Sequence, residues 1–137
     1  MDSGLDKRIV EELVLLFVED EVLTASMFIK TLKRRFKEVY LACNGNEGIE
    51  LFNRYKPDIV LTDILMPKMN GIEMIAAIKE IAKQTPIIVM SAVSELNYIE
   101  RAKELGIQDY LIKPIQSEEF FSVLKRITSD LITQKRK

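Results

Sequence analysis

The segment Ile59-Val60-Leu61-Thr62-Asp63 is a short apolar run that ends in a carboxylate, and the chain turns directly afterwards through Leu65-Met66-Pro67. Pro67 follows the run on one side and Pro57-Asp58 precedes it on the other, which predicts a buried strand over 59–62. Asp63 is therefore expected at the carboxyl end of a strand. In open parallel sheets, ligands bind outside that end of the strands.

Similar apolar runs alternate along the chain with segments of helical period, which is the pattern of repeated βα units. The strands are predicted at 13–18, 38–42, 59–62, 87–90 and 109–112, and the helices at 22–35, around 49–55, at about 71–83 and 95–105, and after Ser117. The strand segments are continuously apolar, which indicates a parallel sheet covered by helices on both faces. We therefore expect an α/β fold, a (βα)5 doubly wound five-stranded parallel sheet in the order 2-1-3-4-5.

Length and composition indicate one ordinary globular domain. The chain has 137 residues, of which 47% are apolar and 30% charged, and a net charge of −1. Such a balance gives no overall attraction to nucleic acid or to an anionic membrane, so neither is expected as a partner. Basic residues cluster between Lys30 and Lys37, where they suit the exposed face and last turn of a helix. We expect the domain to span residues 8–131, with tails at 1–7 and 132–137.

The chain contains one cysteine, Cys43, and no histidine. An internal disulfide is excluded, which fits a reducing compartment. Without histidine there is no imidazole base to activate a cysteine or serine, and most zinc and redox-metal sites are removed. No apolar stretch approaches the roughly 18 residues of a membrane span, and the N-terminus lacks a signal peptide. We expect a cytoplasmic protein.

Acidic residues follow two of the predicted strands. Glu19-Asp20-Glu21 comes after 13–18, and Asp63 ends the strand at 59–62. In the expected order these strands are neighbours, so Asp20 and Asp63 would lie side by side. Carboxylates this close repel unless a cation lies among them, and Mg²⁺ prefers oxygen ligands, which makes Glu19, Asp20 and Asp63 candidate ligands. The alternative is that the acids only cap the following helices, and for Glu21 alone this interpretation is favoured.

Ser91 and Lys113 follow the fourth and fifth predicted strands. Taken singly, either could be an ordinary surface residue. Together they would supply a hydroxyl donor and a fixed cation beside the carboxylates, which could stabilise the oxygens of a phosphoryl group. A carboxylate can also act as a nucleophile toward phosphorus and form an acyl phosphate.

These residues together resemble the receiver domain of two-component response regulators, the CheY-like family with a flavodoxin-like sheet. The resemblance covers about residues 10 to 131. It rests on motifs in the family's order: Glu19-Asp20, Asp63 with Met66-Pro67 and Gly71, Ser91-Ala92, and Asp109-Tyr110-Leu111-Ile112-Lys113-Pro114.

The resemblance implies that Asp63 takes a phosphoryl group from a histidine kinase or a phosphotransfer protein. It implies that Asp20, Asp63 and the backbone carbonyl of Leu65 bind Mg²⁺, with Glu19 reaching the ion through water. Ser91 and Lys113 would contact the phosphoryl oxygens.

Three further features follow from the resemblance. Small Ala92 would leave access to the acyl phosphate, Tyr110 would turn inward on activation, and the Lys113–Pro114 bond would be cis. The departures are Glu for the commoner Asp at position 19, Ser for Thr at 91, and apolar Leu65 and Val93 where many members carry polar residues.

The expected function is a phosphorylation-dependent switch without its own output domain. It would be no enzyme beyond self-phosphorylation and slow autodephosphorylation, and would be a monomer or a phosphorylation-dependent dimer. An aspartate-nucleophile phosphatase would carry Asp-x-Asp after the first strand. Here the candidate nucleophile, Asp63, follows the third strand, and residue 65 is Leu, so no second acid follows it. A dinucleotide-binding domain would need a Gly-rich turn where Glu19-Asp20-Glu21 stands. A receiver excised from a longer hybrid histidine kinase or DNA-binding response regulator remains an open alternative.

Overall fold

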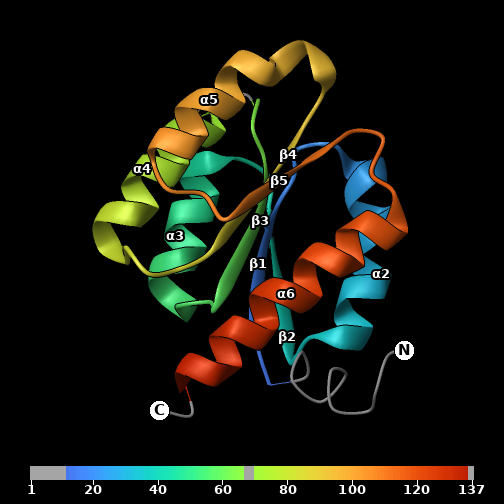
Figure 1. Ribbon diagram of the computed structural model, residues 1–137, viewed down its shortest axis with the longest axis vertical. Coiled ribbons are helices and arrows are strands. Elements are labelled where there is room, and N and C mark those ends of the chain that lie inside the picture. The colour runs from blue at the N-terminus through green and yellow to red at the C-terminus, as the bar shows by residue number, and fades with distance from the viewer. Residues whose placement is uncertain (1–11, 67–69, 136–137) are drawn as a thin grey trace.

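A five-stranded parallel sheet forms the centre of the protein (Figure 1). The computed structural model describes residues 12–66 and 70–135. The strands lie in the order β2-β1-β3-β4-β5, which confirms the predicted topology. Their bounds are β1 Val14–Val18, β2 Glu38–Ala42, β3 Ile59–Asp63, β4 Ile87–Ser91 and β5 Asp109–Ile112.

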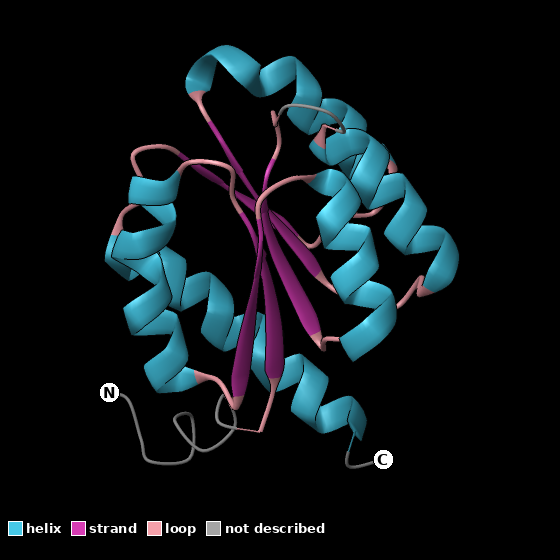
Figure 2. Cartoon of the chain, turned by 180° about the vertical axis from the view of Figure 1, so that it is seen from behind, coloured by secondary structure: helices cyan, strands magenta, loops and turns pink. Residues whose placement is uncertain are grey.

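Helices cover both faces of this sheet (Figures 1 and 2). They are α2 Val22–Arg35, α3 Gly45–Tyr55, α4 Gly71–Ile81, α5 Leu96–Glu104, which a 3₁₀ turn (η1, Val93–Glu95) precedes, and α6 Ser117–Lys135. Helices α2 and α6 lie on one face, and α3, α4 and α5 lie on the other. The doubly wound α/β prediction is thereby confirmed.

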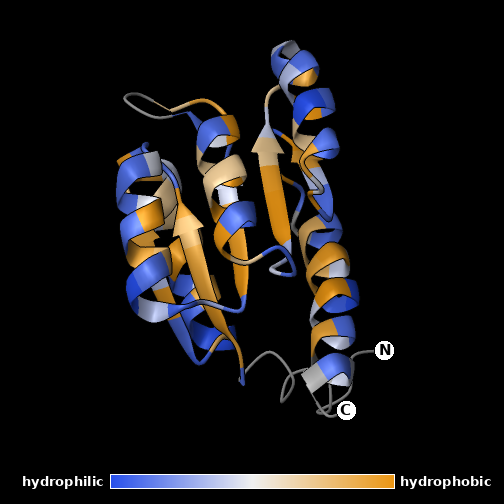
Figure 3. Cartoon of the chain, turned by 90° about the vertical axis from the view of Figure 1, so that its left-hand side faces the viewer, coloured by the Kyte–Doolittle hydropathy of each residue, from blue (hydrophilic) through white to orange (hydrophobic). Residues whose placement is uncertain are grey.

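Each strand supplies side chains to both cores, because successive residues point to opposite faces. Leu15 and Phe17 pack toward α2 and α6, whereas Leu16 and Val18 pack toward α3 and α4. All four are fully buried, which explains why the strands are apolar without alternation. Figure 3 shows the same contrast, with apolar strands between helices that carry both polar and apolar residues.

The helices differ from the predicted pattern at several points, and α3 already begins at Gly45 instead of around residue 49. Apolar residues at helical spacing in and after the first predicted helix are expected to form its buried face; Leu32 and Phe36 are buried, but Leu23 and Met27 are about four-fifths exposed (81% and 79%). The final helix continues through Lys135, so residues 132–135 are helical. Residues 1–7 and Pro67 lie outside the described residues.

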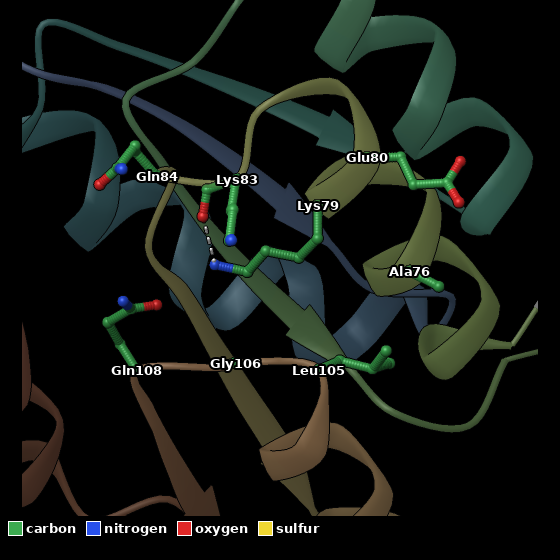
Figure 4. Close-up of a pocket in the computed structure, with 8 residues that line it drawn as sticks. All are labelled: Ala76, Lys79, Glu80, Lys83, Gln84, Leu105, Gly106 and Gln108. Carbon is green, nitrogen blue, oxygen red and sulfur yellow. Dashed lines mark hydrogen bonds between the residues drawn. The ribbon is translucent and has the colours of Figure 1, made fainter.

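Helix α4 ends at Ile81, two residues before the predicted end. The Lys79 ammonium donates hydrogen bonds to the carbonyl oxygens of Lys83 (3.2 Å) and Thr85 (2.9 Å), which hold the chain in a turn instead of another helical turn. Lys79 also lines a hollow of about 480 Å³ between the end of α4 and Gln108 (Figure 4). Because these residues precede β4 and β5, the hollow lies at the opposite end of the sheet from Asp63.

Candidate functional site

The strand register brings the predicted site residues to one edge of the sheet. Val18 pairs with Thr62, so Glu19, the first residue after β1, lies next to Asp63, the last residue of β3. One carboxylate oxygen each from Glu19, Asp20 and Asp63 lies within 4.8 Å of the others. The predicted acidic cluster is therefore present.

Asp63 is 5% exposed and is held from two sides. The Lys113 ammonium lies 3.0 Å from Oδ2, and the backbone N–H of Ile64 donates to Oδ1 at 3.1 Å. The sequence places Lys113 here because it directly follows β5. The peptide bond between Lys113 and Pro114 is cis, as the resemblance implied.

Gly71 allows the loop after Asp63 to close tightly. Its backbone N–H donates to the Ile64 carbonyl at 2.7 Å. A Cβ atom at this position would lie 2.7 Å from the backbone oxygens of both Asp63 and Ile64, which is closer than real contacts allow. Only glycine lets helix α4 begin this near the end of β3.

Glu19 is 2% exposed and carries one oxygen without a hydrogen bond from any described residue. Oε2 accepts from the backbone N–H of Glu21 at 3.1 Å, and Oε1 lies 3.8 Å from the Lys113 ammonium. Burial and the negative charge of Asp63 raise the pKa of Glu19 to about 7. A buried carboxylate oxygen without a donor, beside two other carboxylates, fits a hard divalent cation with oxygen ligands.

Lys113 partly compensates the charge of this cluster. Burial raises the pKa of Asp63, while the hydrogen bond and charge of Lys113 oppose that rise. Burial alone would lower the pKa of Lys113, but the hydrogen bond to Asp63 and the charges of Asp63 and Glu19 outweigh it and raise that pKa. Lys113 is thus a fixed positive charge at neutral pH, as contact with an anion requires.

Ser91 lies at the carboxyl end of β4, as predicted, and is fully buried, but its hydroxyl forms hydrogen bonds with the loop that follows. Oγ donates toward the Ala92 carbonyl (3.1 Å) and Oε1 of Glu95 (3.3 Å). Sequence reasoning did not single out Glu95. A signal for it was present in the sequence: Glu95 stands three residues after Ala92, the position from which an acid caps the start of a helical turn.

Three residues around the site are exposed or half-buried. The apolar side chains of Leu65 and Val93 are 36% and 65% exposed. Tyr110 is half-buried against the core on the α3, α4 and α5 side, with the Lys103 ammonium 5.1 Å from its ring centroid.

The comparison with known proteins decides the family. Residues 15–125 match the response regulator receiver domain family. The chain belongs to this receiver domain family. Receiver domains are signalling modules of two-component systems, not metabolic enzymes; they interact with histidine kinases and phosphotransfer proteins and have an acidic pocket that binds Mg²⁺.

Relatives of this receiver domain differ in length. The chemotaxis protein CheY of Thermotoga maritima is 33% identical over 113 residues, which cover 81% of this chain and 94% of that protein. The regulator of RpoS of Escherichia coli K12 is 34% identical over 102 residues, 74% of this chain but 30% of the relative. The chain therefore spans about a third of some of its relatives.

Solved structures agree with the fold of this receiver domain. The N-terminal domain of an uncharacterized protein from Wolinella succinogenes is 36% identical, with a TM-score of 0.80 over 90% of this chain and 97% of the other. A putative response regulator from Chloroflexus aurantiacus is 27% identical, with a TM-score of 0.78 over 85% and 98%. In the described part of the receiver, no helix has the length and apolar character needed to cross a membrane.

Proposed function

We propose that Asp63 accepts a phosphoryl group from a histidine kinase or a histidine phosphotransfer protein. The observation that carries this proposal is the 3.0 Å contact between Oδ2 of Asp63 and the Lys113 ammonium, inside a cluster of three carboxylates. Asp63 is buried from bulk water, yet the Lys113 ammonium and the carboxylates of Glu19 and Asp20 lie beside it. We further propose that the receiver spans residues 8–131, with tails at 1–7 and 132–137, of which residues 132–135 continue helix α6.

The chemistry needs mainly positioning and charge neutralisation. The phosphorus–nitrogen bond of a phosphohistidine breaks while a carboxylate oxygen of Asp63 bonds to phosphorus, and the imidazole leaves. Lys113 neutralises an oxygen of the phosphoryl group, and Ser91 donates its hydroxyl proton to another. Asp20, Asp63 and the carbonyl of Leu65 would hold Mg²⁺, with Glu19 reaching it through water, and the ion would supply positive charge against the remaining phosphoryl oxygens.

The phosphoryl group would change the conformation of a surface to which partner proteins bind. We propose that this surface comprises α5, β5 and α6, in a monomer or a phosphorylation-dependent dimer in the cytoplasm. The sporulation initiation phosphotransferase F of Bacillus subtilis, 29% identical over 82% of this chain, and CheY are relatives of single-receiver size. The alternative is a receiver module of a longer hybrid kinase or DNA-binding regulator, which the 30% coverage of the regulator of RpoS favours.

Labelling by a small phosphodonor tests the proposal. We expect acetyl phosphate with Mg²⁺ to add one acid-labile phosphoryl group to the wild type and none to Asp63→Ala, measured by intact-protein mass. Asp130→Asn, an exposed acid on α6, serves as the control and should label like the wild type. Undiminished labelling of Asp63→Ala would refute the assignment.

A further inference from the structure

The Ser91 hydroxyl is already engaged in the structure. Its two acceptors, the Ala92 carbonyl and Oε1 of Glu95, lie 3.1 and 3.3 Å away. Both distances exceed the usual value of about 2.8 Å for hydroxyl donors, as expected when one proton is shared between two acceptors. Because a serine hydroxyl carries a single proton, Ser91 cannot also donate to an oxygen on Asp63 while it serves this loop.

Glu95 is held in place independently of Ser91. Its Oε1 accepts from the backbone N–H of Ala92 at 2.9 Å, and its own N–H donates to the Ala92 carbonyl at 2.9 Å. These two bonds close the turn at the start of η1, so the carboxylate remains beside the end of β4 whichever way the Ser91 hydroxyl turns. A charged acceptor also binds a hydroxyl more strongly than a neutral one does.

We propose that Glu95 is a positioning residue that keeps the Ser91 hydroxyl away from Asp63 until Asp63 is phosphorylated. This inference rests on the proposed function, because it takes Ser91 as a donor to the phosphoryl group. A phosphoryl group on Asp63 offers Ser91 a doubly charged competing acceptor on the other side. The long, shared bonds to Ala92 and Glu95 make that exchange easily reversible, as a switch requires.

Replacing Glu95 should therefore favour the activated arrangement. Glu95→Gln keeps an oxygen that can accept from the Ala92 N–H, so the turn is retained, but removes the charge that attracts the hydroxyl. We expect beryllofluoride, a phosphoryl mimic, to bind this variant in the presence of Mg²⁺ about two- to fivefold more tightly than the wild type. Without metal or mimic, the amide resonances near Ser91 and Tyr110 should already move part of the way toward their mimic-bound positions.

Two controls separate this effect from loss of charge or of the cap. Glu50→Gln removes the same charge from the exposed face of α3, where Glu50 pairs with Arg54, and should leave the affinity unchanged. In a Ser91→Ala background, Glu95→Gln should bring no gain, because no hydroxyl is left to release. Glu95→Asp, which keeps the charge but draws the oxygen back, should also tighten binding and gives a second variant if Glu95→Gln folds poorly.

The outcomes discriminate between the two proposals. If the wild type binds beryllofluoride and Glu95→Gln binds it no more tightly, Glu95 does not hold Ser91 and only this inference fails. A gain that persists without the Ser91 hydroxyl would overturn it as well, because the effect would then belong to the turn. If the wild type itself shows no binding, the proposed function fails and the role of Glu95 fails with it.

Discussion

Lys113 faces more negative charge than it can balance. Its ammonium lies 3.0 Å from Asp63 and 3.8 Å from Glu19, and the Asp20 carboxylate completes the same cluster. One positive charge beside three acids leaves the site net negative if all are ionised. The raised pKa of Glu19 is one response of the protein, since a carboxyl group that keeps its proton adds no charge. A bound divalent cation would be another.

The titration of Glu19 should make the metal-free protein less stable as the pH rises. The pKa is raised from 4.5 to about 7 in the folded state, so the folded chain holds more protons than the unfolded chain between these values. The free energy of unfolding should therefore be highest below pH 4.5, as far as this group is concerned, and fall by up to about 3 kcal/mol on rising to pH 7. Urea unfolding in EDTA measures this dependence. Glu19→Gln should flatten it, and an equally steep dependence in that variant would assign the effect to other groups.

Asp20 should matter for the metal more than for the fold. Removing its charge relieves repulsion within the cluster, so we expect Asp20→Asn to have an equal or higher melting temperature without metal. Its affinity for Mg²⁺ should fall about tenfold or more. Glu21→Gln is the matched control, because that neighbouring acid lies outside the cluster and accepts from Thr24. A Mg²⁺ titration of Asp20→Asn identical to that of the wild type would contradict the model of the site.

The positions of the charged site residues could be predicted, because each follows a recognisable apolar strand. Asp63 and Lys113 are 50 residues apart, and parallel strand order alone brings them together. The direction of the Ser91 hydroxyl could not be predicted. It depends on where the loop places the Ala92 carbonyl and the Glu95 carboxylate, and neither is encoded by the strand pattern.

At the scale of elements, two loops with apolar side chains follow β3 and β4. Leu65 is 36% exposed, Val93 is 65% exposed, and Leu96, at the start of α5, is 44% exposed. By the family resemblance, Leu65 and Val93 flank the approach of a water molecule to a phosphoryl group on Asp63. Neither side chain can hydrogen-bond to that water and orient it.

The acyl phosphate should therefore be long-lived. We expect Leu65→Asn and Val93→Glu to lose phosphate faster than the wild type, on the order of tenfold, because each adds a group that can position water. The rate of loss of phosphoprotein after donor removal measures this. Ile81→Asn alters an exposed apolar residue at the far end of α4 and should leave the rate unchanged. If both loop variants keep their phosphate as long as the wild type, the loops do not set the lifetime.

The strands were easier to predict than the faces and ends of the helices. Both faces of a central strand are buried, so the apolar run and the strand coincide, as in Ile59–Asp63. A helix on the surface of a sheet buries only one side of its circumference. Leu23 and Met27 are apolar and helically spaced, yet they lie on the exposed side, which their spacing alone did not reveal. Similarly, the end of α4 depends on Lys79 reaching two carbonyl groups of the following turn, a contact that no helical period specifies.

At the scale of the whole molecule, the charged site lies at the carboxyl ends of the strands, apart from the two apolar cores. Two apolar cores, one on each face of the sheet, fix the five strands. The acids and Lys113 then meet at one edge, because all five strands run parallel. We expect a change at Asp63 to reach the loop of Ser91 and the strand of Tyr110 through directly paired neighbours, since β3 pairs with β4 and β4 with β5.

The central claim is that Asp63 carries the phosphoryl group, and chemical mapping tests it most directly. Wild-type protein treated with acetyl phosphate and Mg²⁺ is reduced with borohydride, which converts an aspartyl phosphate to homoserine, and then digested and sequenced by mass spectrometry. We predict homoserine at position 63 and aspartate at positions 20 and 58. Homoserine at either of those positions, or unmodified aspartate at position 63 in protein that has taken up phosphate, would contradict the claim.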